Sequence, residues 1–457
     1  MVKTVREPTN VIYPIDSRPT LRWSVSLGFQ HVLAMFMGSI TGGVVIGSAT
    51  GLDPINTGRL ISTIYFAMGI ATLLQVTIGS RLPIVQGSST SFVPAYFLLG
   101  KMFAAGNDPI TAVRYIMGGL MLGALVELVI GWGRVVRWLQ YVVSPLSIGV
   151  IIALIGLGLY PVVNSFVGRN WVVASAVAAL IFVFSFVLPG HFRMLGILLS
   201  VVVAYLAVLV GTVAGYFPAG HPLSVNLAAI GGSAWLTVPR PFMWGAPKFH
   251  VAAFLGVLVP YLVSIIESIG DYHATASVSG AAAPTSEDVC RGIGAEGAGC
   301  LVSATLGGTA TTSFSQNIGV IAITGVASRY VVVMAGFILM VLGLFTKLGT
   351  VLATIPRPLL GGVYLVVFGT VAIVGFQQLR RADIDNSRNA AVVGTSLLVG
   401  LAVPAYVAAN PIALPQLPTL QSTLSIVLGT PMAIGGLVAL LLDNLLPGDR
   451  ASRGLAY

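Results

Sequence analysis

Two acidic side chains, Glu267 and Asp271, interrupt the apolar stretch PYLVSIIESIGDYHA. A spacing of four residues places both on one face of a helix. A carboxylate at membrane depth is costly, and it normally faces a cavity or a partner. Two carboxylates on one face repel each other, so one of them can take up and release a proton near neutral pH, as ion coupling requires. The alternative is that the membrane span ends before Asp271 and that both groups lie at a membrane surface.

Amide and aromatic side chains supply a second kind of chemistry. Gln316 and Asn317 are adjacent. Each amide offers a donor beside an acceptor, which matches the C(=O)–N–H edge of an oxidised purine or pyrimidine. Phe92 and Phe314 could stack on a flat ring, and ordinary packing is an equal interpretation. His31, in LGFQHVLAMFMG, either orients the carboxylate pair or lies near the cytoplasmic interface.

The remaining reactive residue types have plainer interpretations. Glu127 stands alone in LGALVELVIGW, and we expect it to be a structural partner of Arg134 or Arg137 rather than part of a transport pathway. Cys290 and Cys300 form no CxxC or His-spaced pattern, so we expect small apolar fillers and no metal. No nucleophile–base or metal constellation is recognisable. The sequence therefore predicts neither an enzyme nor a cofactor.

The composition places these residues in a membrane protein. Only 8% of the 457 residues are charged and 56% are hydrophobic, whereas a soluble chain carries about 25% charged residues. Mean hydropathy is +0.95. A soluble enzyme, a nucleic-acid-binding domain and a disordered chain are excluded. The net charge of +9 comes from scattered Lys and Arg residues without a basic run, so no nucleic-acid partner is expected.

The apolar runs between polar punctuation predict an all-α polytopic protein with fourteen spans, each needing about 20 residues to cross as a helix. The predicted spans are 24–47, 57–78, 84–98, 110–132, 138–160, 170–188, 193–216, 250–270, 294–307, 314–326, 328–346, 358–377, 389–408 and 424–445.

Three of these spans, 84–98, 294–307 and 314–326, are too short to cross as helices. Polar stretches rich in Gly, Ser and Thr occupy 86–92 and 307–317, and they begin about 230 residues apart, close to half the chain. Irregular backbone at membrane depth persists only where it is buried in protein or lines a cavity. The pattern indicates an inverted repeat with a binding site between its halves. The alternative is a pair of Gly-rich loops at the membrane surface.

Charge bias predicts the orientation. With fourteen spans both termini share one side, which then holds 15 of the 23 Lys and Arg residues, against 8 on the other side. Cytoplasmic loops carry the excess of basic residues, so we expect cytoplasmic termini in a multi-pass protein of the plasma membrane. Residues 1–22 contain six charged side chains and no preceding apolar core, and they are expected to be a tail rather than a signal peptide.

Four motifs resemble one known family. The segment SQNIGVIAITG (315–325) is similar to the signature of the nucleobase–ascorbate transporters, the nucleobase:cation symporters, through Gln316, Asn317, Gly319, Thr324 and Gly325. ESIGDYHA (267–274) resembles the eighth-span motif of that family. Gln30-His31 resembles its first-span pair, and Thr90-Ser91-Phe92 resembles its third-span segment. The resemblance extends along essentially the whole chain, in order.

The resemblance implies an architecture. The family has fourteen spans arranged as two inverted seven-span repeats, with short strands in spans 3 and 10, and forms a homodimer through gate domains. Transferred to this chain, the N-terminal tail is 1–22, the core domain comprises 23–132 (spans 1–4) and 250–346 (spans 8–11), and the gate domain comprises 133–216 (spans 5–7) and 347–445 (spans 12–14). An extracytoplasmic loop (217–249) and a C-terminal tail (446–457) complete the chain.

The resemblance also implies roles for individual residues. Glu267 and Gln316 would bind the base through their side chains, and Ser91 and Phe92 would contact it from the third span. The residues that would support the site and proton coupling are Asp271, His31 and Asn317.

The first signature position sets the subgroup. Gln316 together with a final Gly325 resembles the xanthine and uric acid members, whereas uracil members carry Glu and ascorbate members carry Pro at the first position. The resulting prediction is a proton-coupled purine importer for xanthine or uric acid. The alternatives are a uracil transporter, a sulfate or bicarbonate transporter of related fold, and a membrane-embedded enzyme.

Overall fold

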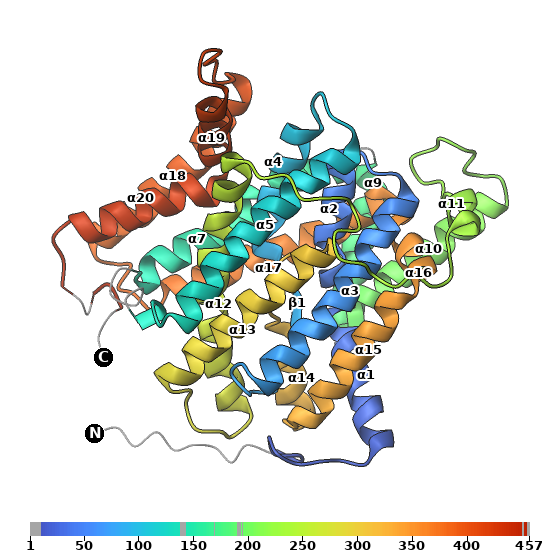
Figure 1. Ribbon diagram of the computed structural model, residues 1–457, viewed down its shortest axis with the longest axis horizontal. Helices are drawn as coiled ribbons and strands as arrows, with labels where there is room; N and C mark the ends of the chain where they lie inside the picture. The colour runs from blue at the N-terminus through green and yellow to red at the C-terminus, as the bar shows by residue number, and fades with distance from the viewer. Residues whose placement is uncertain are drawn as a thin grey trace.

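The computed structural model describes residues 11–137, 143–168, 170–189, 193, 195–449 and 452–454. Parts of both predicted tails and the start of the predicted span 138–160 lie outside these ranges. The described chain is helical apart from two short strands (Figure 1). In chain order its elements are α1 (Leu21–Ser39), α2 (Thr41–Thr50), α3 (Pro54–Thr77), β1 (Gln86–Ser88), the 3₁₀ turn η1 (Thr90–Phe92), α4 (Val93–Ala104), α5 (Pro109–Trp132), α7 (Pro145–Gly158), α8 (Tyr160–Val167), α9 (Trp171–Val187), α10 (Gly196–Val213), α11 (Leu227–Gly232), α12 (Val251–Val278), α13 (Ser286–Leu306), β2 (Thr311–Ser313), α14 (Gln316–Thr324), α15 (Arg329–Leu344), α16 (Thr346–Ala353), α17 (Arg357–Leu379), α18 (Ser387–Ala409), α19 (Pro418–Gly429) and α20 (Pro431–Leu445).

The helices have the length and composition of membrane spans. Within the described ranges, eight are long and apolar enough to cross a bilayer, with α1 and α2 counted together and α7 and α8 counted together. Two further pairs, α15 with α16 and α19 with α20, pass the same test but bend by 77° and 78°. The chain is therefore a polytopic membrane protein, and the fourteen-span repeat remains a prediction.

Caps and prolines determine where several helices begin. Asp53 accepts hydrogen bonds from the backbone N–H groups of Ile55 and Asn56 at 2.9 and 3.0 Å, and a proline opens α3. An acidic cap followed by Pro at the first helical position satisfies the free N–H groups of a helix start.

The same kind of cap corrects one predicted boundary. The helix that contains the predicted span 294–307 begins at Ser286, because Thr285 and Asp288 form a capping box ahead of the apolar run. The helix is therefore 21 residues long, and the prediction of a short segment there is wrong. Only β1 and β2, with the short helices that follow them, break the regular spans at these places.

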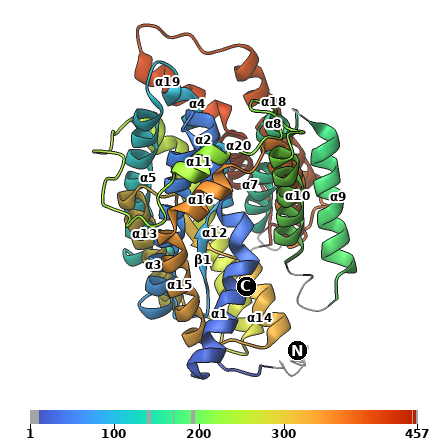
Figure 2. The ribbon, with the colours of Figure 1, turned by 90° about the vertical axis from the view of Figure 1, so that its right-hand side faces the viewer.

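The helices form two groups that pack side by side. The first group comprises α1–α5 and α12–α16, and the second comprises α7–α10 and α17–α20. Figure 2 shows α3, α5, α13 and α15 on the side of the molecule away from α9 and α10. Glycines allow close backbone contact inside each group. A Cβ at Gly69 would lie 2.5 Å from the Gly336 carbonyl oxygen, and a Cβ at Gly375 would lie 2.2 Å from the Ala153 nitrogen.

The two strands meet inside the first group. They pair antiparallel, with Gln86 opposite Ser313 and Ser88 opposite Thr311. Both are fully buried, in agreement with irregular backbone covered by protein. Gly87 faces the Phe314 ring, and a Cβ there would lie 2.2 Å from that ring. The polar stretches predicted to form a site are therefore joined, and they are not surface loops.

Candidate functional site

The end of β1 reaches the first carboxylate of α12. Ser91, in the turn η1, donates a hydrogen bond through Oγ to Glu267 Oε2 at 3.1 Å. Ser91 is buried, and Glu267 is half-buried. The structure thus brings together two residues that are far apart in the sequence and that the motifs identified separately.

The end of β2 reaches the second carboxylate. Ser315 Oγ lies 2.9 Å from each carboxylate oxygen of Asp271. Because α12 continues to Val278, this one helix holds both carboxylates. Each broken segment therefore supplies one serine hydroxyl to one carboxylate of α12. Ser315 was not among the predicted site residues, although it is the first residue of the signature segment.

His31 and Asn317 form a buried pair beside these groups. Asn317 Nδ2 lies 3.1 Å from His31 Nδ1 and donates to the His31 carbonyl oxygen at 3.2 Å. Both side chains are almost completely buried, so His31 is covered by protein. The contact fixes α14 against α1. Among the described contacts, His31 makes no hydrogen bond to Glu267 or Asp271.

Gln316 and Phe92 differ in their accessibility. Gln316 is the first residue of α14, and its side chain is exposed, as is that of Ser315. The Phe92 ring is fully buried, with its centroid 4.7 Å from that of Tyr261 in an edge-on contact. A ligand could therefore reach Gln316 and Glu267 directly, whereas contact with the Phe92 ring would require that ring to be uncovered.

A third carboxylate, Glu296 on α13, lies at the centre of a hydroxyl cluster that sequence reasoning missed. Ser264 Oγ and Ser268 Oγ donate to its Oε1 at 2.9 Å, and Thr312 Oγ1 donates to the same oxygen at 3.0 Å. Ser268 also lies 2.6 Å from Oε2, and Ser313 and Tyr272 reach Oε2 at 3.4 Å. Glu296 is 1% exposed.

This cluster fixes the frame of the site. It ties α12 and α13 to β2, the strand that leads to Ser315. The signal in the sequence was the spacing of Ser264, Ser268 and Tyr272 at intervals of four, which lines one face of α12 with hydroxyls. A single Glu in the glycine-rich stretch GIGAEGAG is its acceptor.

Sequence comparison identifies the family. Residues 22–409 match the family model described as "Permease family". "Solute carrier family 23 member 1" of Mus musculus is 34% identical over 98% of this chain and 82% of its own length. "Nucleobase-ascorbate transporter 3" of Arabidopsis thaliana is 28% identical over 97% of this chain and 86% of its own length.

The chain belongs to the nucleobase–ascorbate transporter family. The fold extends beyond that family. The transmembrane domain of a cyanobacterium bicarbonate transporter, BicA, superposes with a TM-score of 0.55 at 12% identity, over 91% of this chain and 99% of that one. At this identity the likeness concerns the fold alone. This member of the nucleobase–ascorbate transporter family is thus a multi-pass transport protein.

In this family member, Glu127 does not have the expected partner. Arg134 and Arg137 instead pair with Glu287, at 3.1 and 3.7 Å. Glu127, on α5, is fully buried where this helix packs against α13, and a Cβ at Gly297 of α13 would lie 3.0 Å from the Glu127 carbonyl carbon. Arg134 has a left-handed backbone (φ 61°) just beyond the end of α5, so the chain has left the helix before it reaches that arginine. The predicted ion pair is therefore wrong.

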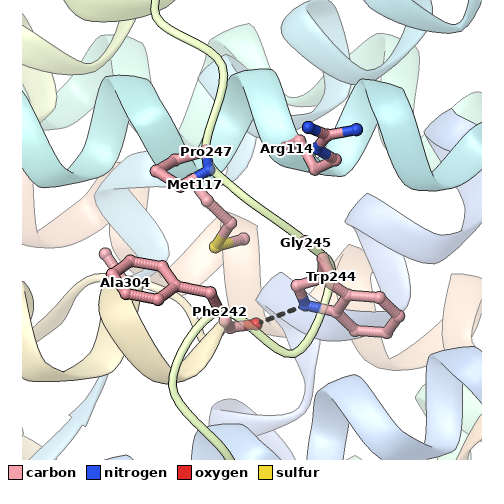
Figure 3. Close-up of a pocket in the computed structure, with 8 residues that line it drawn as sticks. Arg114, Met117, Phe242, Trp244, Gly245, Pro247 and Ala304 are labelled. Carbon is pink, nitrogen blue, oxygen red and sulfur yellow. Dashed lines mark hydrogen bonds between the residues drawn. The ribbon is translucent and has the colours of Figure 1, made fainter.

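The enclosed cavity drawn in Figure 3 is not the transport site. Arg114, Met117, Phe242 and Trp244 line it, and the Trp244 indole donates to the Gly307 carbonyl oxygen at 3.0 Å. Its volume is about 10 Å³, which is room for about one water. None of the predicted site residues of this transporter lines it.

Proposed function

We propose that the protein is a proton-coupled symporter that imports a purine nucleobase of the xanthine or uric acid type. Family membership supports a nucleobase or ascorbate substrate. The observation that carries the purine assignment is Gln316, an exposed amide that directly follows Ser315, the residue whose hydroxyl contacts Asp271. An amide suits the C(=O)–N–H edge of an oxidised purine.

Glu267 is the second recognition group in this proposal. Ser91 occupies Oε2, and Oε1 accepts no hydrogen bond from a described residue. An ionised carboxylate accepts hydrogen bonds only, and xanthine and uric acid carry several ring N–H donors. A base held between Glu267 and Gln316 would bridge α12 and α14, the two elements that the strand ends position.

Asp271 supplies the coupling step, one helical turn from Glu267. When the substrate binds Glu267, the negative charge that Glu267 presents to Asp271 changes. Because that charge influences proton uptake by Asp271, substrate binding and proton uptake become linked. His31 and Asn317 support α14 beside the site. Symport then needs neither a metal nor a separate ion site.

Transport follows from movement of the first helical group, which is the predicted core together with α16, against the second group, the rest of the predicted gate. The site lies wholly on the first group, so a displacement of that group carries the bound base from one side of the bilayer to the other. The proposal includes the two inverted seven-span repeats, a homodimer joined through the second group, and residence in the plasma membrane with cytoplasmic termini.

The test is uptake of radiolabelled xanthine, urate and uracil into cells that lack their own carriers, at several external pH values. We expect accumulation of xanthine or urate, faster at acidic external pH, that a protonophore abolishes. Preferential uptake of uracil, or uptake that depends on sodium and ignores the protonophore, would overturn the proposal. Uptake of bicarbonate or sulfate alone would favour the anion-transporter alternative.

A further inference from the structure

The segment ahead of α1 is tied to the loop between α14 and α15. The backbone N–H of Ile12 donates to the Gly325 carbonyl oxygen at 2.8 Å, and that of Ala327 donates to the Tyr13 carbonyl oxygen at 2.8 Å. The backbone N–H of Arg329 donates to the Ile15 carbonyl oxygen at 2.9 Å. Residues 12–18, the N-terminal strap, thus have a fixed place along the end of the molecule at the lower edge of Figure 1.

An open cleft of about 450 Å³ lies between this strap, the C-terminal end of α3 and the first turn of α15. Three arginines line it: Arg18, Arg81 and Arg329. Its one lining carboxylate is Asp16, which pairs with Arg329. Arg18 and Arg81 make no ion pair with a described residue, so the cleft carries two uncompensated positive charges.

Arg81 is held in an unusual conformation beside this cleft. Its backbone is left-handed (φ 58°), which is uncommon for a residue other than glycine. Its Nε donates to the Thr77 carbonyl oxygen at 3.1 Å, at the last residue of α3. This bond uses one of the five N–H donors of the guanidinium and leaves the others for a ligand.

An apolar stripe continues from the cleft along α15. Val333 lines the cleft, Phe337 is 50% exposed and Val341 is 53% exposed. The spacing of four puts the three on one helical face, and eight residues of helix extend about 12 Å. Because Phe337 and Val341 are this exposed within the whole chain, the second helical group does not cover this face. Figure 2 places α15 in the layer away from that group.

We propose that this cleft binds the headgroup of an anionic phospholipid, with an acyl chain along Val333, Phe337 and Val341. A basic pocket between helix ends at a membrane surface suits a phosphate-bearing headgroup. A soluble phosphate ion would use the arginines but gain nothing from the stripe. The positive charge and the apolar stripe together therefore identify a lipid rather than a free anion.

The first experiment measures binding of dioleoyl phosphatidylglycerol to the purified full-length protein in detergent, by native mass spectrometry and by the shift in melting temperature. Dioleoyl phosphatidylcholine provides the same chains on a neutral headgroup. We expect phosphatidylglycerol to bind more tightly and the Arg18→Gln/Arg81→Gln variant to lose about thirtyfold in affinity, since each basic residue near the surface contributes about fivefold. Equal affinity for the two lipids would overturn the proposal.

The matched control is Arg134→Gln/Arg137→Gln, which removes two arginines that pair with Glu287, away from the cleft. It should leave phosphatidylglycerol affinity unchanged, and an equal loss there would show that only net charge matters. Arg18→Gln alone, on the exposed strap, keeps the test valid if the double variant fails to fold. Phe337→Ser should weaken binding of phosphatidylglycerol. It should leave unaltered the concentration of inorganic phosphate needed to compete with the lipid headgroup. If inorganic phosphate displaces the lipid completely and Phe337→Ser has no effect, the cleft is a phosphate site.

Discussion

Glu267 lies on α12 and Glu296 contacts the same helix from α13, and the two carboxylates differ in how many hydrogen bonds they accept from the protein. Glu296 accepts hydrogen bonds from the hydroxyls of five side chains and is buried from solvent. Glu267 takes one hydroxyl, from Ser91, and is half-buried. A carboxylate whose acceptor positions are filled by the protein holds structure together, whereas one with positions left open can bind a ligand. The difference supports the proposed role of Glu267 in ligand binding and indicates a structural role for Glu296.

The largest effect should come from Glu267→Gln. It keeps the shape but places an amide donor against the N–H donors of the base and removes the titrating group. We expect xanthine accumulation to fall by at least about a hundredfold, because a buried polar mismatch and lost coupling act together. The melting temperature should stay unchanged.

Glu287→Gln is the control, because it removes the same charge from a residue that lies outside the site. Asp271→Asn should bind substrate nearly normally yet accumulate little. Protonophore-sensitive accumulation by Glu267→Gln would remove this residue from both recognition and coupling.

Glu296→Gln should produce the contrasting pattern, with transport and stability falling together. One oxygen that accepts from Ser268 becomes an amide donor, and the hydroxyl cluster loses part of its acceptor. Unsatisfied buried groups cost about 1–3 kcal/mol, so the melting temperature should drop and less protein should reach the membrane. Native transport with an unchanged melting temperature would break the distinction between the two carboxylates.

These two residues also mark what the sequence could and could not predict. Glu267 and Asp271 were identifiable because both lie in one apolar helix and local periodicity defines their shared face. Glu296 was missed because its structural role depends on the hydroxyls of Thr312, Ser313 and α12. Only tertiary packing brings these hydroxyls to the Glu296 carboxylate. Sequence spacing predicted the paired polar breaks at 86–92 and 307–317 but not the antiparallel register of the strands within them, since short strands are specified by their surroundings.

Gln316→Glu tests recognition of the base, and we expect a smaller effect than from Glu267→Gln. The change removes the amide donor and adds a charge one residue after Ser315, the partner of Asp271. Loss of one paired group costs about 1–3 kcal/mol, which lowers xanthine affinity roughly ten- to a hundredfold. Competition by xanthine, urate and uracil should change in order as well as in strength. An unaltered competition profile would show that Gln316 lies outside the recognition surface, and Gln378→Glu, on α17 of the second group, is the matched control.

The smallest effect concerns the outer end of the frame, where α13 begins outside the apolar part of the chain. A hydrogen bond from the Thr285 hydroxyl holds the pKa of Asp288 below its usual value of 3.8, and Arg291 adds to the effect. A lowered pKa in the folded state stabilises the protein above the unfolded-state pKa, and this contribution is lost as the pH falls through the folded-state pKa.

Thr285→Ala removes the cap at a cost of about 1 kcal/mol at pH 7. The melting-temperature difference from the unaltered protein should be full at pH 7 and shrink below about pH 4. A melting-temperature difference that is constant from pH 7 to pH 3 would show that Asp288 contributes nothing to the cap. A loss of xanthine affinity in Thr285→Ala would show that the start of α13 and the Glu296 cluster do not act as separate parts of the frame.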